Sequence, residues 1–340
     1  MEASMVVGVD THKDSHSAAL LDAVGALQAA FEVPATASGY RELLGWARAR
    51  SRARAWVVEG TGSYGAGLAA YLGSQGEAVY EGDHPKRSWR GPAGKSDQLD
   101  AIWVAKDALS RRQLGWPKRR GEREMLRVLL SAREGAVRAQ TQGLNQLYAL
   151  VVAAPEALRR RLHRRRGVAL VKACLQLRRR GDPETALTAA TMRSVALRVK
   201  ALLAEADDYE RQIRVLVAGL APSLLGELGV GPLTAAQLLV SWSHGGRVRS
   251  ADAFAKLAGV APIPASSGRV QRHRLNRLGD RRLNRALHTV AITRARCDRE
   301  TQAYVARRTQ EGKSPREIRR CLKRYIARRL FRILERLDKT

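Results

Sequence analysis

MVVGVD, residues Met5–Asp10, is a short run rich in β-branched residues that ends in an acid. Two further strand-like stretches follow it, Ser15–Leu21 and Leu27–Val33, and residues 22–25 form a turn signal between them. Three short strands joined by tight turns predict an antiparallel meander at the start of the chain. This meander decides the fold class, because it must pack its apolar face against whatever follows.

Helical and strand-like patterns alternate after the meander. Ser38 is placed to cap a helix, and the apolar stretch Ala53–Glu59 returns as a strand that again ends in an acid. A meander followed by α/β alternation indicates a mixed sheet flanked by helices, and we assign this domain to residues 1–115. The remaining elements expected in it are a helix at Ala66–Leu72, a strand at Ala78–Glu81 and a helix capped by Ser96 that runs to Leu109.

The middle of the chain has no strand signals. From Glu122 to about Gly219 the glycines are few and apolar residues recur at helical spacing. We predict a long, coiled-coil-like helical arm over residues 116–220 that serves oligomerisation and nucleic-acid contact. An intramolecular bundle explains the spacing equally well, because heptads are not sustained over three or four repeats.

Residues 221–340 are predicted to form a mainly α-helical C-terminal domain. Within it LGVGPLTA, residues 228–235, has the glycine-turn pattern of a helix-hairpin-helix, whose backbone N–H groups can hold a phosphate. Ordinary helix punctuation by Gly and Pro is the alternative interpretation.

The charge balance points to a polyanionic partner. The 340 residues contain 61 Lys and Arg against 32 Asp and Glu, which gives a net charge of +29 and a pI near 11.2. The chain is 45% hydrophobic, so this charge belongs to folded surfaces rather than to a disordered tail. A phosphate backbone is the natural counterpart. Because only 5% of residues are aromatic, a single-stranded binder built on stacking platforms is disfavoured.

The cysteines and the N-terminal residues indicate in which cellular compartment the protein is expected. Cys174, Cys297 and Cys321 are far apart and form no C-x-x-C, so neither a disulfide framework nor a cysteine zinc site is supported. The first residues lack the order of a secretory signal, and no run reaches the roughly 20 apolar residues of a membrane helix. We therefore expect a reduced, cytoplasmic protein with no membrane partner.

Four acids stand out by position: Asp10 and Glu59 end predicted strands, and Asp97 and Asp100 are three apart on one helix face. Acids at strand ends and on an adjoining helix can converge at one sheet edge. Oxygen ligands suit Mg²⁺ or Mn²⁺, and two ions about 4 Å apart suit phosphodiester chemistry. Each acid taken singly is also explained as a cap. Spacing alone does not exclude four nearby acids as metal ligands instead, and these are Asp14, Asp22, Asp83 and Asp107.

The nearby histidines are interpreted as surface or fold residues rather than as ligands. His12 and His16 are four apart but straddle a strand-to-turn stretch, and His84 has no partner at the spacing of a helical zinc site.

Five ordered motifs resemble the DEDD transposases of bacterial insertion sequences, and more narrowly the insertion sequence one-ten family. The resemblance covers both ends of the chain, residues 5–105 and 224–330. The motifs are VGVDTHKDSH (Val7–His16), VVEGTGSYG (Val57–Gly65), GKSDQLDA (Gly94–Ala101), LAGVAPIPASSG (Leu257–Gly268) and LNRLGDRRLNRALH (Leu275–His288).

The resemblance implies a RuvC-like domain of RNase H fold at the N-terminus, with the four acids named above as its catalytic metal ligands. It also implies a serine nucleophile ahead of a glycine in the C-terminal domain. Here that serine is Ser267, with Ser266 as the neighbouring alternative. It further implies a guide RNA encoded by the element, which pairs with donor and target DNA while the protein contacts backbone.

These expectations combine into a mechanism. No His or Lys neighbours Ser267 in sequence, so we expect metal ions of the acidic cluster to activate its hydroxyl, in a composite site shared between protomers. The attack of the serine is expected to give a covalent phosphoserine–DNA intermediate. We expect the protein to act as a homo-oligomer, a dimer or a dimer of dimers, and to work in the cytoplasm at the bacterial nucleoid. A Mg²⁺-dependent, structure-specific nuclease without a covalent intermediate is the alternative enzyme, and a non-catalytic nucleic-acid-binding protein is the alternative outside enzymes.

Arginine clusters are the predicted nucleic-acid contacts, and each phosphate contact would steepen the salt dependence of binding. A solvated basic face is the alternative. The predicted contacts are Arg159, Arg160, Arg161, Arg164, Arg165, Arg166 and 178–180 on the arm, and Arg269, Arg272 and Arg274 beyond the serine.

Overall fold

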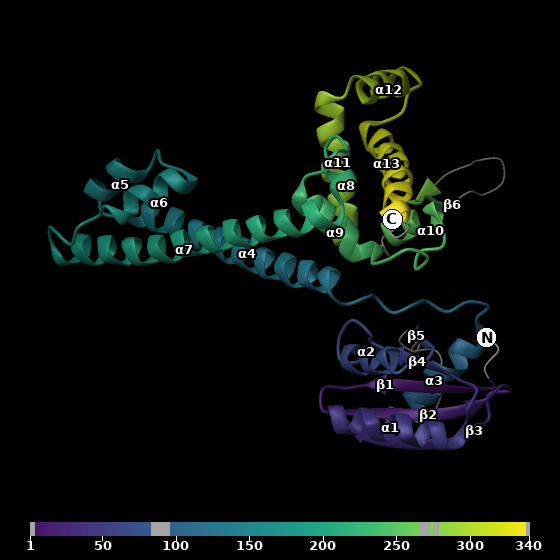
Figure 1. Ribbon diagram of the computed structural model, residues 1–340. Helices are drawn as coiled ribbons and strands as arrows, with labels where there is room; N and C mark the ends of the chain where they lie inside the picture. Colours follow the sequence, from purple (N-terminus) through teal and green to yellow (C-terminus); the bar gives the residue numbers. More distant parts are fainter. Residues whose placement is uncertain (1–3, 83–95, 265–272, 275, 277–278, 338–340) are drawn as a thin grey trace. The chain divides into compact units, whose positions relative to one another are not determined.

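A computed structural model describes residues 4–82, 96–264, 273–274, 276 and 279–337. The chain divides into two compact units, residues 1–120 and 121–340 (Figure 1). The three domains expected from the sequence, with boundaries after residues 115 and 220, stay a prediction.

The first unit is built on one mixed sheet with the strand order β3-β2-β1-β4-β5. Strands β1, β2 and β3 form the predicted antiparallel meander, and β4 and β5 run parallel to β1. The mixed sheet is therefore confirmed, and it is consistent with an RNase H-like α/β domain. The strands are β1 (Met5–Thr11), β2 (Ser15–Asp22), β3 (Leu27–Pro34), β4 (Arg54–Glu59) and β5 (Val79–Gly82).

Helices cover both faces of this sheet. Along β1, Val7 and Val9 face a core formed with α1 (Ala37–Arg50) and α2 (Ala66–Ser74). Val6 faces the opposite core, which α3 (Asp97–Ser110) closes. Since successive side chains of a strand point to opposite faces, the residues of β1 with even numbers lie toward α3.

The helix caps are set by local sequence. Ser96 caps α3 as predicted, with its Oγ accepting from Leu99 N at 3.2 Å. The prediction that Ser38 caps α1 is wrong, because Thr36 Oγ1 accepts from Gly39 N instead. Strand β3 ends at Pro34, so the helix begins two residues earlier than expected and Ser38 falls inside its first turn.

The described residues of the second unit form helices and one two-stranded ribbon. Two long helices, α4 (Glu122–Ala153) and α7 (Pro183–Leu220), pack along each other, with α5 (Glu156–Leu162) and α6 (Gly167–Leu175) at one end (Figure 1). The remaining elements gather at the other end. They are α8 (Pro222–Leu225), α9 (Pro232–Trp242), α10 (Ala251–Leu257), β6 (Ile263–Pro264), β7 (His273–Arg274), α11 (Arg281–Cys297), α12 (Arg299–Gln310) and α13 (Pro315–Leu337).

Each end of the second unit has its own apolar core. Buried residues such as Leu147, Leu170 and Met192 join α4, α6 and α7, and a larger cluster joins α9, α10, α11 and α13. In the predicted helix-hairpin-helix, Gly229 adopts φ +83° and Pro232 opens α9. Binding of a phosphate there stays a prediction. None of the helices in the described ranges combines the length and apolar character of a membrane span.

Candidate active site

Asp10 and Glu59 end neighbouring strands of the sheet. The parallel register of β1 and β4 sets Val9 beside Val58, so the next residue of each strand is one of these acids. Both side chains lie toward α3, because Asp10 alternates with Val9 and Glu59 alternates with Val58. Both residues are buried, with exposed fractions of 5% and 7%. The register of the sheet thus brings two acids 49 positions apart in sequence to the same edge and face.

Helix α3 supplies the other two acids from its first turn. Asp100 is buried, and half of the Asp97 side chain is exposed. The helix can approach β1 closely because Gly8 has no side chain, since a Cβ there would lie 2.3 Å from the carbonyl oxygen of Ala101. This close contact places the start of α3 beside the end of β1.

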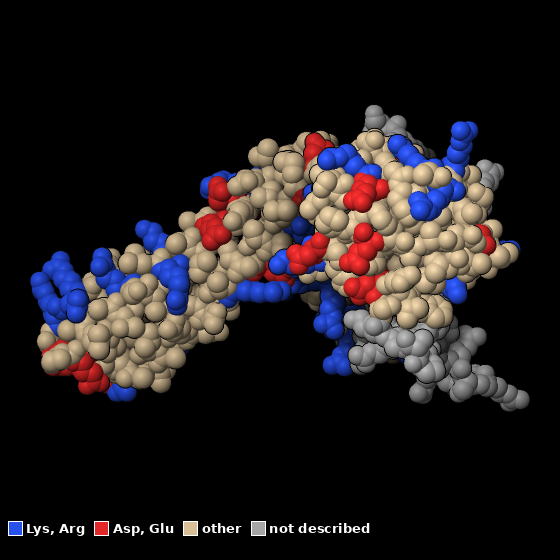
Figure 2. Space-filling view, turned by 90° about the horizontal axis from the view of Figure 1, so that it is seen from below, with Lys and Arg blue, Asp and Glu red and all other residues tan. Residues whose placement is uncertain are grey.

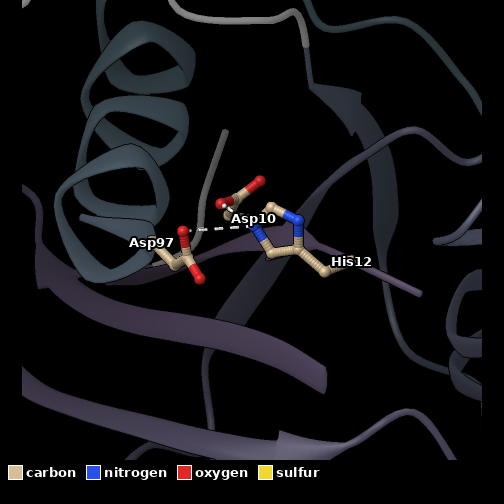
Figure 3. Close-up of side chains that lie close together, drawn as sticks. All are labelled: Asp10, His12 and Asp97. Carbon is tan, nitrogen blue, oxygen red and sulfur yellow. Dashed lines mark hydrogen bonds and ion pairs between the residues drawn. The ribbon is translucent and has the colours of Figure 1, made fainter. Parts of the chain in front are cut away.

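His12 lies between two of the carboxylates (Figure 3). Its Nε2 is 3.0 Å from Asp10 Oδ2 and 3.3 Å from Asp97 Oδ1. Sequence reasoning treated His12 as a surface or fold residue. The signal that could have found it is the two-residue spacing from Asp10, which puts both side chains on one face of an extended strand.

The other histidines differ. His16 is fully buried and stacks on Tyr40 with 5.7 Å between ring centroids, as a fold residue does. His84 lies outside the described residues.

The electrostatics of the site suit a divalent cation. Burial raises the pKa of the Asp10 carboxyl above its ordinary value of 3.8, the charge and hydrogen bond of His12 lower it in part, and the charges of Asp100 and Asp97 raise it further. A carboxylate whose pKa is raised by burial and by neighbouring negative charges is stabilised in its ionised form by a bound cation. Carboxylate oxygens are the ligands that Mg²⁺ and Mn²⁺ prefer. The residues present therefore fit a divalent metal ion.

The turn after Glu59 is fixed by short contacts. Thr11 Oγ1 donates to the carbonyl oxygen of Glu59 at 3.0 Å, and Gly60 adopts φ +63°, a conformation that favours glycine. Thr61 Oγ1 donates to Glu81 Oε1 at 3.1 Å. These contacts tie β1, β4 and β5 together at the edge that carries the acids.

The predicted nucleophile Ser267, its alternative Ser266, and the predicted contacts Arg269 and Arg272 lie outside the described residues. The ends of the segment that contains them are held together. Asp280 N donates to the carbonyl oxygen of Leu257 at 2.7 Å. A Cβ on Gly279 would lie 2.2 Å from Gly259 N, so only glycine permits this approach. Arg274 is exposed and pairs with Ile263 in the β6–β7 ribbon.

The predicted arginines of the arm lie on the surface near α5 and α6. All six of Arg159–Arg161 and Arg164–Arg166 are exposed. Figure 2 shows Lys and Arg side chains around this end of the α4–α7 pair. A groove of about 660 Å³ opens nearby, with Arg178, Arg179 and Arg193 in its lining. The exposed guanidinium groups form a surface that suits a phosphate backbone.

Comparison with known proteins identifies the family. A family model described as "Transposase IS116/IS110/IS902 family" matches residues 224–306, and the DEDD transposase model of the IS110 group matches residues 7–154. The chain belongs to the IS110 family of DEDD transposases. The uncharacterized 42 kDa protein of insertion element IS900 from Mycobacterium paratuberculosis is 29% identical in an alignment of 282 positions that covers 68% of this chain and 68% of the relative.

The family assignment confirms the resemblance seen in the sequence motifs. The transposase is an enzyme, and its substrates are DNA. The match over residues 7–154 includes the sheet edge with Asp10 and Glu59 and the start of α3. The four acids, Ser267 and the arginines stay predictions as individual site residues.

Proposed function

We propose that this transposase cleaves and rejoins donor and target double-stranded DNA with two divalent cations, Mg²⁺ or Mn²⁺, held by Asp10, Glu59, Asp97 and Asp100. The observation that carries the proposal is the gathering of acids from β1, β4 and α3 at one sheet edge, within a chain of net charge +29. In a protein that binds polyanions, acids beside the substrate repel it unless cations neutralise them.

Bound ions of this kind supply charge stabilisation for the attacking and leaving oxygens of a phosphodiester. The chain's own part is to fix the ligands. Burial holds Asp10 and Asp100 in place, Thr11 anchors the end of β4, and the close contact at Gly8 sets the distance of α3 from β1. Preorganised ligands of this kind cost little reorganisation during the reaction.

Ser267 is the proposed nucleophile. Its Oγ would form a bond to phosphorus as the bond from phosphorus to the leaving sugar oxygen breaks; the serine gives up its proton, and the leaving oxygen takes one up. A phosphoserine–DNA ester keeps the bond energy for rejoining. The support for this residue is the position of Ser267 before Gly268 in a motif that resembles the family's, and Ser266 is the alternative.

A guide RNA encoded by the element is the proposed source of sequence recognition, with base pairing reading both DNAs. The support is the resemblance together with the exposed arginines of the arm, which would contact backbone. Recombination between two duplexes also favours a homo-oligomer assembled through the arm, acting in the cytoplasm at the nucleoid.

The test is a search for a covalent protein–DNA adduct. The purified protein, the candidate RNA and both DNAs are mixed in Mg²⁺, and adducts are resolved on denaturing gels for wild type, Ser267→Ala, Ser266→Ala and Asp10→Asn. We expect the adduct in wild type and Ser266→Ala, and its loss in the other two variants. Cleaved ends without an adduct in the wild type would overturn the serine step and favour the nuclease alternative. DNA binding without cleavage under every metal tested would favour the non-catalytic alternative.

A further inference from the structure

His12 is held in place at the acidic cluster by the hairpin between β1 and β2. Its backbone N–H donates to the carbonyl oxygen of Ser15 at 3.0 Å, so the residue directly after the end of β1 is held against the first residue of β2. Strand alternation then directs the imidazole to the same face as the Asp10 carboxylate. The His12 side chain is 43% exposed, which leaves it accessible to solvent and ions.

Two distances from His12 Nε2 to carboxylate oxygens match the spacing of neighbouring ligands around one ion. One atom each from Asp10, His12 and Asp97 lie within 4.8 Å of one another, and Nε2 is 3.0 and 3.3 Å from the two carboxylate oxygens. An octahedral ion with ligands at about 2.1 Å separates neighbouring ligand atoms by about 3.0 Å and opposite ones by about 4.2 Å. The same distances accommodate N–H···O hydrogen bonds, so a cation would take the place of the proton on Nε2.

We propose that His12 provides a nitrogen ligand to the cation held by Asp10 and Asp97, and that this nitrogen makes the site prefer Mn²⁺ to Mg²⁺. Mg²⁺ is a hard cation that favours oxygen and keeps several waters, whereas imidazole suits transition metals. A site of carboxylates alone would discriminate less. The inference rests on the proposed metal-binding function of the acidic cluster and adds a ligand of a different chemical class.

Pulsed electron paramagnetic resonance of bound Mn²⁺ tests the nitrogen directly. The full-length protein is loaded with substoichiometric Mn²⁺, once with natural nitrogen and once with ¹⁵N-labelled histidine. We expect ¹⁴N modulation of the Mn²⁺ echo that changes to the ¹⁵N frequencies in the labelled protein and disappears in His12→Gln. His163→Gln is the matched control, because His163 is an exposed histidine at the end of α5 and is expected to leave the spectrum unchanged.

Affinity provides the second measurement. Counting free Mn²⁺ by its room-temperature spectrum, we expect His12→Gln to weaken Mn²⁺ binding by about tenfold or more, the range seen when the surroundings of a metal site are disturbed. Mg²⁺, measured by competition, is expected to weaken less. Equal weakening of both ions would overturn the preference for Mn²⁺.

The outcomes separate this inference from the proposed function. Mn²⁺ binding that Asp10→Asn abolishes, without a histidine nitrogen signal in wild type, would overturn the role of His12 and leave the acidic metal site standing. Mn²⁺ binding that Asp10→Asn does not change would overturn both. If His12→Gln does not fold, the labelled wild type together with Asp10→Asn still decides the question.

Discussion

Gly8→Ala is the substitution with the most direct consequence for both the fold and the site. The added Cβ would lie 2.3 Å from the carbonyl oxygen of Ala101, 2.7 Å from Ala105 N and 2.8 Å from Ala105 Cβ. The first two atoms belong to the backbone, so no change of rotamer relieves the contact. Helix α3 must move away from β1 by about 1 Å, and overpacking of this kind costs about 1–3 kcal/mol.

The same movement reaches the candidate active site. Because Asp97 and Asp100 lie in the first turn of α3, they move with the helix while Asp10 stays on β1. A misplacement of about 1 Å can lower a rate by about 100-fold. We expect the melting temperature of the first unit to fall by about 5–10 °C for a loss of about 2 kcal/mol, and metal-dependent DNA cleavage to fall by about 100-fold.

Calorimetry and the cleavage assay measure the two effects, and Gly45→Ala is the control. Gly45 lies in α1, and no heavy atom comes within 4 Å of a Cβ added there. That substitution is expected to stabilise the helix by about 0.5–1 kcal/mol and to leave cleavage unchanged. A Gly8→Ala protein that melts and cleaves like the wild type would refute the argument that the contact between β1 and α3 sets the geometry of the acids.

Two further predictions concern pH and salt. Burial lowers the pKa of His16 below 6.5, so the folded protein keeps the ring neutral while the unfolded chain takes up a proton, and stability is lost as pH falls below about 6.5. His16→Phe keeps an aromatic ring against Tyr40 but removes the group that takes up a proton. Between pH 7.5 and 5.5 the free energy of unfolding of this variant should therefore fall less than that of the wild type, with a difference of at most about 1.4 kcal/mol per pH unit. Equal loss of stability in the two proteins over this pH range would contradict the prediction. Replacing the exposed Arg164 and Arg165 together with Ala should make the slope of log affinity against log salt for duplex DNA shallower by about 1.8, as measured by fluorescence anisotropy, and an unchanged slope would assign both to a solvated face.

Much of the first unit could be predicted because its signals are local. The β-branched run at Met5–Asp10 and the apolar run before Glu59 favour strands by their own composition, and both form strands. Ser96 caps a helix through its own hydroxyl. The cap of α1 could not be predicted in the same way. Thr36 and Ser38 have the same chemistry, and the point at which β3 ends decides between them.

Only part of the candidate site could be predicted from the sequence. The four acids stood out because each sits at the end of a strand or the start of a helix, and their spacing matched a family pattern. His12 was missed, since its importance depends on Asp97, which lies 85 positions away along the chain and 3.3 Å away in space. The two-residue spacing indicates only that the side chain of His12 lies on the same face as that of Asp10.

By itself, the amino-acid sequence determined the types of elements, the positive charge and the membership of a transposase family, because periodicity, composition and short motifs are properties of neighbouring residues. Only the tertiary structure decided that β1 lies between β2 and β4, that Gly8 admits α3, and that His12 stands between two carboxylates. The physical reason is burial. Both faces of the sheet must be covered, and the strand pairing that achieves this fixes the register between segments that are far apart in the sequence. The local sequence of one segment does not show which other segment it pairs with.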